Sequence, residues 1–248
     1  MREDMHVHST FSDGRHTVEE NTATAAQRGL QRLGCVDHVR RDTTWLPDFV
    51  RHVRAVDRRT PVTLEVGVEA KILDARGRLD VPADLRGVER IYAADHQVPW
   101  REGTLRPQDV RRSLQLGRLD RADVLELLTL GTRNAMRRYE RVVLAHLFSV
   151  LPKVGISEDD VPLDLVDELA CAAAETGAEI EVDERWRCPS PRVVARFAAR
   201  GVPVRASSDS HRRETIGRYR YVHEVFRTVA LARLTDPRVI DAPSRHAA

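Results

Sequence analysis

The sequence has little cysteine, almost no lysine and no long apolar run. Three cysteines, at 35, 171 and 188, are too few and too irregularly spaced to staple a chain of 248 residues, so we expect reduced thiols. Lys71 and Lys153 are the only lysines, and arginine supplies the rest of the 40 basic residues. Because 38 acidic residues leave a net charge of +2, a polybasic nucleic-acid tail and an acidic disordered protein are both excluded.

Membrane and secretion signals are missing as well. No apolar run approaches the roughly 20 residues that span a bilayer, and Glu3 and Asp4 stand where a secretory signal would turn apolar. We therefore expect a cytoplasmic protein with no membrane partner. Hydrophobic residues at 42% and charged residues at 31% are typical of a globular protein. No Gly/Ser-rich linker divides the chain, so we expect one domain over residues 1–234 and a tail over 235–248.

Short β-branched runs alternate with helical patterns along the whole chain. The runs predict strands at residues 5–8, 33–36, 62–68, 90–94, 142–145, 178–182 and 202–207. Helices are predicted between them, at 17–28, 46–56, 121–138, 163–175 and 191–199. This alternation indicates an α/β fold with a parallel sheet, either open and doubly wound or closed as a (β/α) barrel. The glycine fingerprint of a dinucleotide-binding sheet is missing.

Histidines gather where the predicted strands end. Six of the ten lie at a strand's carboxyl end or in the turn after it: His6, His8, His38, His96, His146 and His211. Acidic residues stand at the same level: Asp13, Asp37, Glu69, Asp95, Asp183 and Asp209. Because the carboxyl ends of parallel strands converge on one face, these side chains are expected to meet in one cavity.

The spacing of these residues predicts a metal centre. His6 and His8 are two apart on an extended strand, so both imidazoles project from the same side, and Asp209 and His211 repeat that spacing. Imidazole combined with carboxylate suits Zn, Mn or Fe. The candidates exceed what one tetrahedral ion can use. We therefore expect two or three divalent ions, with Glu69 as the bridging carboxylate.

The order of these motifs resembles the PHP family, the polymerase and histidinol phosphatase group of metal-dependent phosphoesterases. The resemblance spans residues 6–211 and rests on His6-Val7-His8-Ser9, Ser12-Asp13-Gly14, Val36-Asp37-His38, Gly67-Val68-Glu69, Val143-Leu144-Ala145-His146 and Ser207-Ser208-Asp209-Ser210-His211. It implies a distorted seven-stranded (β/α) barrel, a (β/α)7 fold, with a metal cluster at the strand carboxyl ends. One departure is Asp183, which stands where an asparagine is usual.

The resemblance also implies how the ligands divide among three metal sites. His6, His8, Glu69 and Asp209 resemble one site. Glu69, His96 and His146 resemble a second, with Glu69 shared. Asp13, His38 and His211 resemble the third.

The activity implied by the resemblance is hydrolysis of a small phosphomonoester by metal-activated hydroxide attack on phosphorus. Glu69, Asp209 and His211 are the catalytic candidates, and either His211 or a water would protonate the leaving oxygen. Phosphate charge that the metals leave unmatched suits arginine, whose planar fork fits two oxygens. Arg185 and Arg187 follow the sixth predicted strand and Lys71 follows Glu69, so these three are candidate substrate-binding residues.

Three alternatives remain open on the sequence alone. A cyclic-nucleotide or nucleic-acid phosphodiesterase would use the same fold, although the small net charge disfavours a long nucleic acid. An amidohydrolase-type metal hydrolase also begins with two histidines in this spacing. A metal-stabilised binding protein without turnover belongs to a different class. The oligomeric state and the leaving alcohol are not encoded in a readable motif.

Overall fold

The computed structural model describes residues 1–235; of the expected tail at 235–248, all but the first residue lies outside the described part. Seven parallel strands form one sheet in the order β1-β2-β3-β4-β7-β8-β9. They are β1 (Glu3–Val7), β2 (Arg32–His38), β3 (Thr63–Lys71), β4 (Arg90–Ala94), β7 (Val142–Ala145), β8 (Glu179–Asp183) and β9 (Val204–Ser207). Each of the seven predicted strands is present.

The sheet curls until its first and last strands meet. Val7 on β1 forms a parallel bridge with Ser210, just after β9. The His8 N–H donates to the Ser210 carbonyl at 2.9 Å, and the Ser210 N–H donates to the His6 carbonyl at 3.2 Å. The expected (β/α)7 barrel is therefore confirmed, as a nearly closed parallel barrel.

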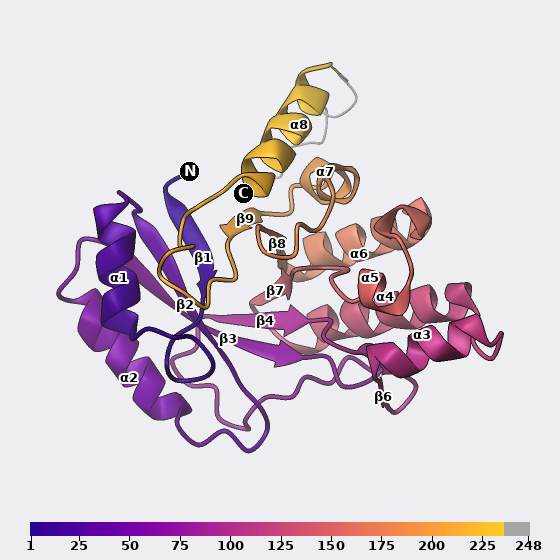
Figure 1. Cartoon of the computed structure of the whole chain (residues 1–248), viewed down its shortest axis with the longest axis horizontal. Helices are drawn as coiled ribbons and strands as arrows, with labels where there is room; N and C mark the ends of the chain where they lie inside the picture. The colour runs from indigo at the N-terminus through magenta and orange to yellow at the C-terminus, as the bar shows by residue number, and fades with distance from the viewer. Residues whose placement is uncertain (236–248) are drawn as a thin grey trace, which may run out of the picture.

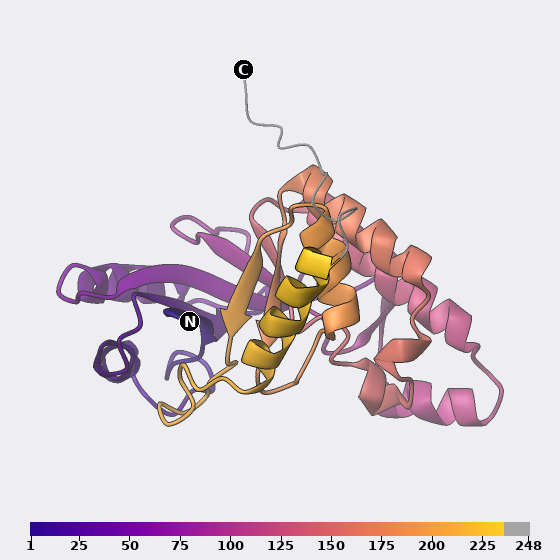
Figure 2. The same ribbon diagram turned by 90° about the horizontal axis from the view of Figure 1, so that it is seen from above.

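Helices surround the strands on the outside (Figure 1). They are α1 (Val18–Gln27), α2 (Leu46–Asp57), α3 (Pro107–Gln115), α4 (Arg121–Arg138), α5 (Leu151–Val154), α6 (Leu163–Thr176), α7 (Pro191–Ala199) and α8 (Tyr221–Thr235). A two-stranded hairpin, β5 (Val98–Trp100) and β6 (Gly103–Leu105), precedes α3. Figure 2 shows α8 running alongside α7 at the end of the barrel wall where β9 lies. Within the described residues, none of the helices has both the length and the apolar character to span a bilayer.

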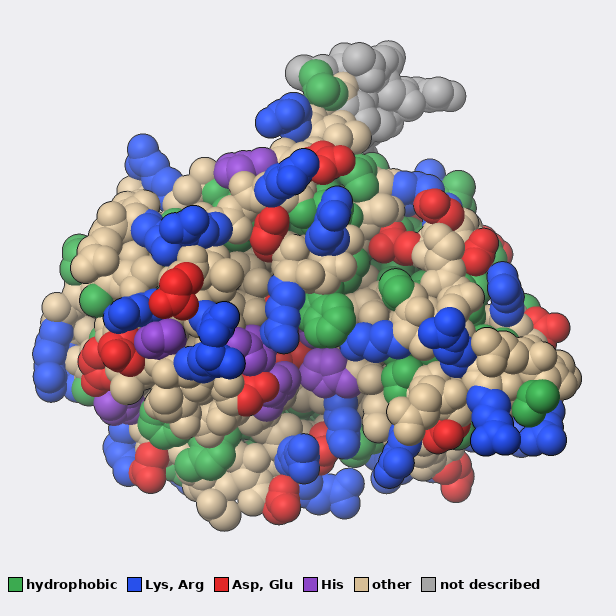
Figure 3. Space-filling view, in the orientation of Figure 1, with side chains coloured by type: hydrophobic (Ala, Val, Ile, Leu, Met, Phe, Trp, Pro, Cys, Tyr) green, Lys and Arg blue, Asp and Glu red, His purple; other side chains and the backbone are tan. Residues whose placement is uncertain are grey.

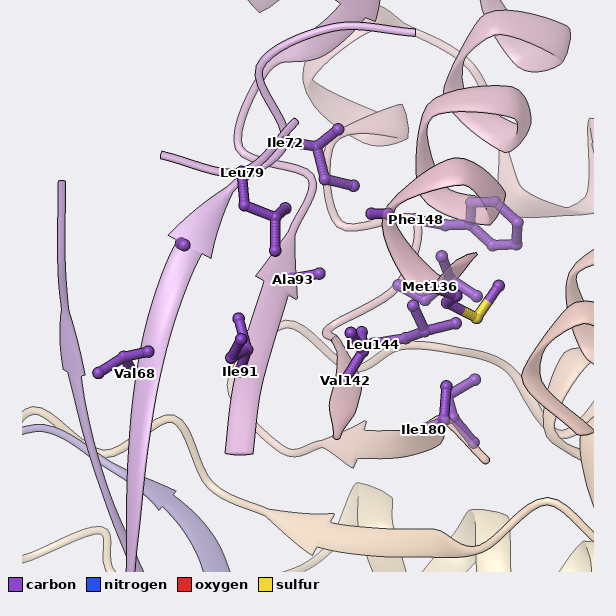
Figure 4. Close-up of a cluster of buried hydrophobic side chains, with 14 of the residues drawn as sticks. Val68, Ile72, Leu79, Ile91, Ala93, Met136, Val142, Leu144, Phe148 and Ile180 are labelled. Atoms are coloured by element: carbon purple, nitrogen blue, oxygen red, sulfur yellow. The ribbon is translucent and has the colours of Figure 1, made fainter. Parts of the chain in front are cut away.

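Alternation along each strand separates the core from the barrel interior. On β4, Ile91 and Ala93 belong to the large cluster that packs against the helices, whereas Tyr92 and Ala94 belong to a small separate cluster inside the barrel. Figure 4 shows the outer cluster, where side chains of β4 and β7 face Met136 of α4. Because successive strand residues point to opposite faces, the inward positions on β3 include both Glu65 and Glu69.

An ion cluster fills the end of the barrel opposite the strand carboxyl ends. The Arg205 side chain is only 6% exposed and pairs with Glu65 and Glu179. It also lies 3.3 Å from the Tyr92 hydroxyl, which donates to the Met5 carbonyl. These contacts fill the end of the barrel at the strand amino termini, the lower end. The inward residues near the strand carboxyl termini, the upper end, therefore form a separate polar layer.

Candidate metal centre

Glu69 lies at the centre of the polar layer, near the carboxyl end of β3, and is 1% exposed. Its Oε1 is 2.9 Å from the Nε2 atoms of both His96 and His146. Its Oε2 is 3.4 Å from the Nε2 atoms of His6 and His8. The same Oε2 is 3.0 Å from His38 Nδ1. One carboxylate therefore presents each of its oxygens to a different set of imidazoles.

Asp209 divides its oxygens in a similar way. Oδ1 lies 3.1 Å from His8 Nε2 and 3.4 Å from His211 Nδ1. Oδ2 instead accepts the indole N–H of Trp186 at 2.7 Å and contacts the Arg185 guanidinium at 3.3 Å. Trp186 and Arg185 thus fix the carboxylate and leave Oδ1 directed at the histidines.

A third group of ligand candidates lies at the mouth of the barrel. Asp13 Oδ2 is 3.1 Å from His211 Nε2 and 3.6 Å from His38 Nε2. Asp13 Oδ1 is 3.7 Å from His8 Nδ1. The Asp13 side chain is 55% exposed, so this group is open to solvent, unlike the one around Glu69.

The chemistry of these donors fits divalent metal ions. Their ligand atoms approach within 4.8 Å of one another in several groups, among them His6–His8–Asp209, Glu69–His96–His146 and His8–Asp13–His38–His211. The fit also shows in buried atoms that have no hydrogen-bond partner in the described structure: His6 Nε2, His8 Nδ1, His8 Nε2 and Asp209 Oδ1. Buried polar atoms without a partner are costly, and cations at these positions would satisfy them.

The charge states of His8 and Glu69 fit a metal site, whereas nearby carboxylates raise the pKa of His6, His38 and His146 against the effect of burial, so these three must lose a proton to bind an ion. Burial lowers the pKa of His8 to about 4, which keeps this imidazole neutral, as a metal ligand must be. Burial opposes ionisation of Glu69, but hydrogen bonds from the histidines around it, His146 foremost, hold its pKa well below the ordinary value. The centre therefore contains an ionised carboxylate, and His8 beside it is a free imidazole donor.

Carboxylates behind the ligands orient two of the imidazoles. Glu181 on β8 contacts His6 Nδ1 through both oxygens, at 3.2 and 3.1 Å, and accepts the His146 backbone N–H at 2.7 Å. Asp95 accepts the Ser149 hydroxyl at 2.7 Å, and that hydroxyl lies 2.9 Å from His146 Nδ1. Such outer partners set the ring orientation, so that Nε2 faces the centre. Glu181 was not among the predicted residues, because a glutamate at an alternating position on the sixth main strand gives no separate signal until its neighbours are known.

Asp37 and Asp183 are buried but do not join the ligands at the mouth. Asp37 accepts the Ser9 N–H at 3.0 Å and the Ser9 hydroxyl at 2.6 Å, and so holds the turn that follows β1. Asp183 accepts the Trp186 N–H at 2.7 Å. Burial, together with the Glu181 and Asp209 charges, raises the pKa of Asp183 well above its usual range. Neither carboxylate lines the cavity described next, but an Asp183 oxygen lies within 4.8 Å of ligand atoms of His6 and Glu181, behind the ligands.

Two ligand candidates occupy strained backbone. His146 has φ of 32° and Asp209 has φ of 47°, both in the left-handed region that side-chain-bearing residues rarely adopt. His146 directly follows β7, and Asp209 comes two residues after the end of β9. Strain of this kind persists where the surroundings over-determine the geometry, and it is common at functional sites.

A cavity of about 600 Å³ opens over the metal centre. Figure 3 shows histidines gathered near the middle of this face, with Lys and Arg side chains around them. Two substrate-binding candidates, Arg185 and Lys71, line the cavity, and Lys71 Nζ lies 3.6 Å from Asp80. Arg187 does not line it; its guanidinium lies over the ring of Tyr221 at 5.7 Å. Trp186, which also lines the cavity, was not predicted.

All nine predicted ligands come together from the whole length of the chain. They are His6, His8, Asp13, His38, Glu69, His96, His146, Asp209 and His211. Their individual roles at each ion stay predictions.

Comparison with known proteins also points to a metal-binding phosphoesterase. The PHP domain matches residues 4–147, more than half of the chain. A curated relative, phosphoribosyl 1,2-cyclic phosphate 1,2-diphosphodiesterase of Eggerthella lenta, is 42% identical over 79 residues, which is 32% of this chain and only 28% of the relative. A solved histidinol phosphate phosphatase of Lactococcus lactis, complexed with zinc, L-histidinol and phosphate, superimposes over 93% of both chains with a TM-score of 0.66. Its sequence identity is 16%, so this second similarity concerns the fold.

Proposed function

The chain belongs to the PHP domain family of metal-dependent phosphoesterases, and we propose that it hydrolyses a small phosphomonoester at the cluster around Glu69. The observation that carries the proposal is the division of the Glu69 carboxylate, with one oxygen facing two histidines and the other facing three. A carboxylate shared in this way suits two neighbouring cations, and paired cations are widely used to cleave phosphate esters.

We assign two or three divalent ions of zinc, manganese or iron to the centre. The first would take His6, His8, Glu69 and Asp209, and the second would take Glu69, His96 and His146. The third would take Asp13, His38 and His211. Because Asp13 is half exposed, this third set is the one most open to solvent.

Bound divalent ions would neutralise the phosphate oxygens and make hydroxide available near neutral pH. The chain itself supplies orientation and protons. Arg185 lines the cavity beside Asp209, where its guanidinium can bind phosphate oxygens, and Lys71 also lines this cavity. Arg187 would need to leave the Tyr221 ring to reach a substrate. With the third ion absent, His211, which lines the same cavity, would donate the proton that the leaving oxygen needs; with that ion bound, a water in the cavity would donate it.

The test is an activity screen with controlled metal content. Protein stripped by a chelator is assayed on small phosphomonoesters, phosphodiesters and amides, before and after Zn²⁺, Mn²⁺ or Fe²⁺ is restored. We expect monoester hydrolysis only with metal, and a loss of more than about 100-fold in His146→Ala, because that ligand faces Glu69. His223→Ala is the matched control, since His223 is exposed on α8. Metal uptake without turnover of any ester, or turnover of amides alone, would contradict the proposal.

A cyclic phosphodiester is the second candidate substrate. The observation that favours it is the local identity to the Eggerthella lenta diphosphodiesterase. Comparing kcat/KM for a five-membered cyclic phosphate of a sugar with kcat/KM for the corresponding monoester separates the two. A higher value for the cyclic compound would replace the monoester as the substrate class.

A further inference from the structure

One acid in the wall of the cavity over the metal centre is not among the predicted metal ligands. Of the described residues that line this cavity, four are acidic, and Asp13, Glu69 and Asp209 belong to the ligand set. The fourth is Asp80, in the segment that follows β3. A carboxylate repels a phosphate group. Asp80 therefore suits the alcohol part of a phosphate ester better than its phosphate.

The Asp80 side chain is held in place by the chain around it. Leu79 forms an antiparallel bridge with Ile72, and the Asp80 N–H donates to the Lys71 carbonyl at 3.1 Å. Asp80 Oδ1 accepts the Arg41 N–H at 2.9 Å. Because the backbone and one carboxylate oxygen are both fixed, Oδ2 is the oxygen that is left for another partner.

Lys71 and Asp80 together offer a hydrogen-bond donor and an acceptor. Lys71 Nζ lies 3.6 Å from Asp80 Oδ2, which is within ion-pair range but too far for a hydrogen bond. Both side chains line the cavity. A hydroxyl group both donates and accepts, so it matches this pair. An ammonium group on the substrate would instead meet the like charge of Lys71.

An apolar surface lies in the same cavity, on the segment that Asp80 contacts through Arg41. Val39 and Trp45 of this segment line the cavity, together with Phe11. The Trp45 and Phe11 rings are packed with centroids 5.6 Å apart, and both contact the buried ring of Phe49. Carbon atoms of the alcohol would leave water on this surface, which favours binding.

We propose that Lys71 and Asp80 bind a hydroxyl group on the alcohol part of the substrate. This inference rests on the proposed function and names its substrate class: a phosphate ester whose alcohol carries at least one further hydroxyl, such as a polyol or a sugar. Asp80 Oδ2 accepts a hydrogen bond from that hydroxyl, and Lys71 Nζ donates one to its oxygen. The two residues determine specificity and take no part in bond cleavage.

The experiment uses ω-hydroxyalkyl phosphates with three to six carbons. The alkyl, ω-methoxyalkyl and ω-aminoalkyl phosphates of the same chain length are the comparisons, because a methoxy group keeps the oxygen but cannot donate. In the metal-loaded wild type, kcat/KM should be about tenfold or more higher for the hydroxyl compound at one chain length, the factor that a hydrogen bond to a charged group contributes. Equal values for the hydroxyl and methoxy compounds, or a higher value for the amino compound, would overturn the proposal.

Variants at the pair separate substrate binding from a structural role. Asp80→Asn keeps an oxygen for the Arg41 N–H but loses the charge, and the preference for hydroxyl over methoxy should fall to about twofold or less, mainly through KM. Lys71→Met should lower the same ratio. Asp42→Asn is the matched control, since Asp42 is an exposed acid next to Arg41 that does not line the cavity. Equal losses on both substrates in Asp80→Asn would show that Asp80 only holds the loop, against the proposal.

A binding measurement keeps the inference testable without turnover. Titration calorimetry on the metal-loaded protein compares the ω-hydroxyalkylphosphonate with the ω-methoxyalkylphosphonate, whose C–P bonds are not hydrolysed. The hydroxyl compound should bind more tightly to the wild type and to Asp42→Asn, and the difference should be lost in Asp80→Asn. A difference that persists in Asp80→Asn would overturn the hydroxyl site. Absence of any esterase activity with the binding preference intact would overturn the proposed function and leave this site supported.

Discussion

Trp186 controls a metal-ligand candidate without being one. Its indole N–H occupies Asp209 Oδ2, so Oδ1 alone is directed at His8 and His211. Its ring also packs near His146, with centroids 5.9 Å apart, and Lys153 lies over its face. At the scale of single residues, the geometry of the centre depends on residues that hold the ligand candidates, such as Trp186, as well as on the ligand candidates themselves.

Trp186→Phe is therefore expected to keep the aromatic packing but lose the hydrogen bond to Asp209. Zinc affinity, measured by competition with a chromogenic chelator, should fall about tenfold, the lower end of what outer supports contribute. Trp100→Phe on the hairpin is the control and should retain wild-type affinity. Equal affinity in the two variants would remove Trp186 from the metal centre.

Glu69→Gln removes the charge that both sets of imidazoles face. We expect kcat/KM on a phosphomonoester to fall more than about 100-fold, which exceeds the decrease caused by losing a residue that only orients a ligand. The amount of bound metal per chain should fall as well. Glu126→Gln, at an exposed position on α4, should leave both quantities unchanged. Full metal content together with wild-type activity in Glu69→Gln would contradict the bridging role.

Ligand candidates could be predicted from the sequence because strand ends converge wherever strands are parallel. His96 and His211 needed only that rule and the strand positions. Trp186 and Glu181 could not be found in the same way. The contact from Trp186 to Asp209 depends on the path of the turn after β8, and Glu181 looks like any polar residue on an alternating strand until its neighbours are known.

At the scale of elements, the position of β1 determines where His6 and His8 lie. Gly34 on β2 faces β1 closely: a Cβ at this position would come 2.1 Å from the Met5 carbonyl oxygen. A side chain there must push the two strands apart. Gly34 is therefore needed for the approach that brings β1 to its place in the sheet.

Gly34→Ala is expected to lower the free energy of unfolding by about 2 kcal/mol, as overpacking in a tight interior does. Metal affinity should fall in the same variant because His6 and His8 move with β1. Gly103→Ala, where an added Cβ meets nothing within 4 Å, should unfold like the wild type. Urea denaturation of the three proteins measures this, and a Gly34→Ala midpoint equal to that of Gly103→Ala would disprove the close-approach argument.

The seven main strands were predictable because each is a short β-branched run between helical patterns. The hairpin of β5 and β6 was not, since its strands are three residues long, one contains Pro99, and they pair only with each other. Strand ends also differed: β2 extends to His38 and β3 to Lys71, beyond the apolar runs. The polar residues there continue the ladder because neighbouring strands supply hydrogen bonds.

At the scale of the whole molecule, the barrel is polar at both ends and apolar between them. The lower end contains Arg205 with Glu65 and Glu179, and the upper end contains the candidate metal centre. Val36, Tyr92 and Val143 separate the two layers. A buried pair that loses one partner leaves an uncompensated charge.

Arg205→Ala is accordingly expected to cost about 3 kcal/mol of unfolding free energy, because two partly buried carboxylates lose their cation. Since the metal centre lies at the other end, metal stoichiometry of the folded variant should stay as in the wild type. Arg86→Ala breaks an exposed pair with Asp84 and should leave the thermal midpoint unchanged. Similar midpoints for the two variants would show that the lower cluster does not stabilise the barrel.

The most direct measurement of the central claim is anomalous X-ray diffraction from zinc-loaded crystals, recorded above and below the zinc absorption edge. The account predicts two or three zinc-specific peaks in the upper layer of the barrel. One peak should lie on the Oε1 side of Glu69, toward His96 and His146, and one on the Oε2 side, toward His6 and His8. A single peak that does not touch Glu69, or zinc bound only outside this layer, would contradict it.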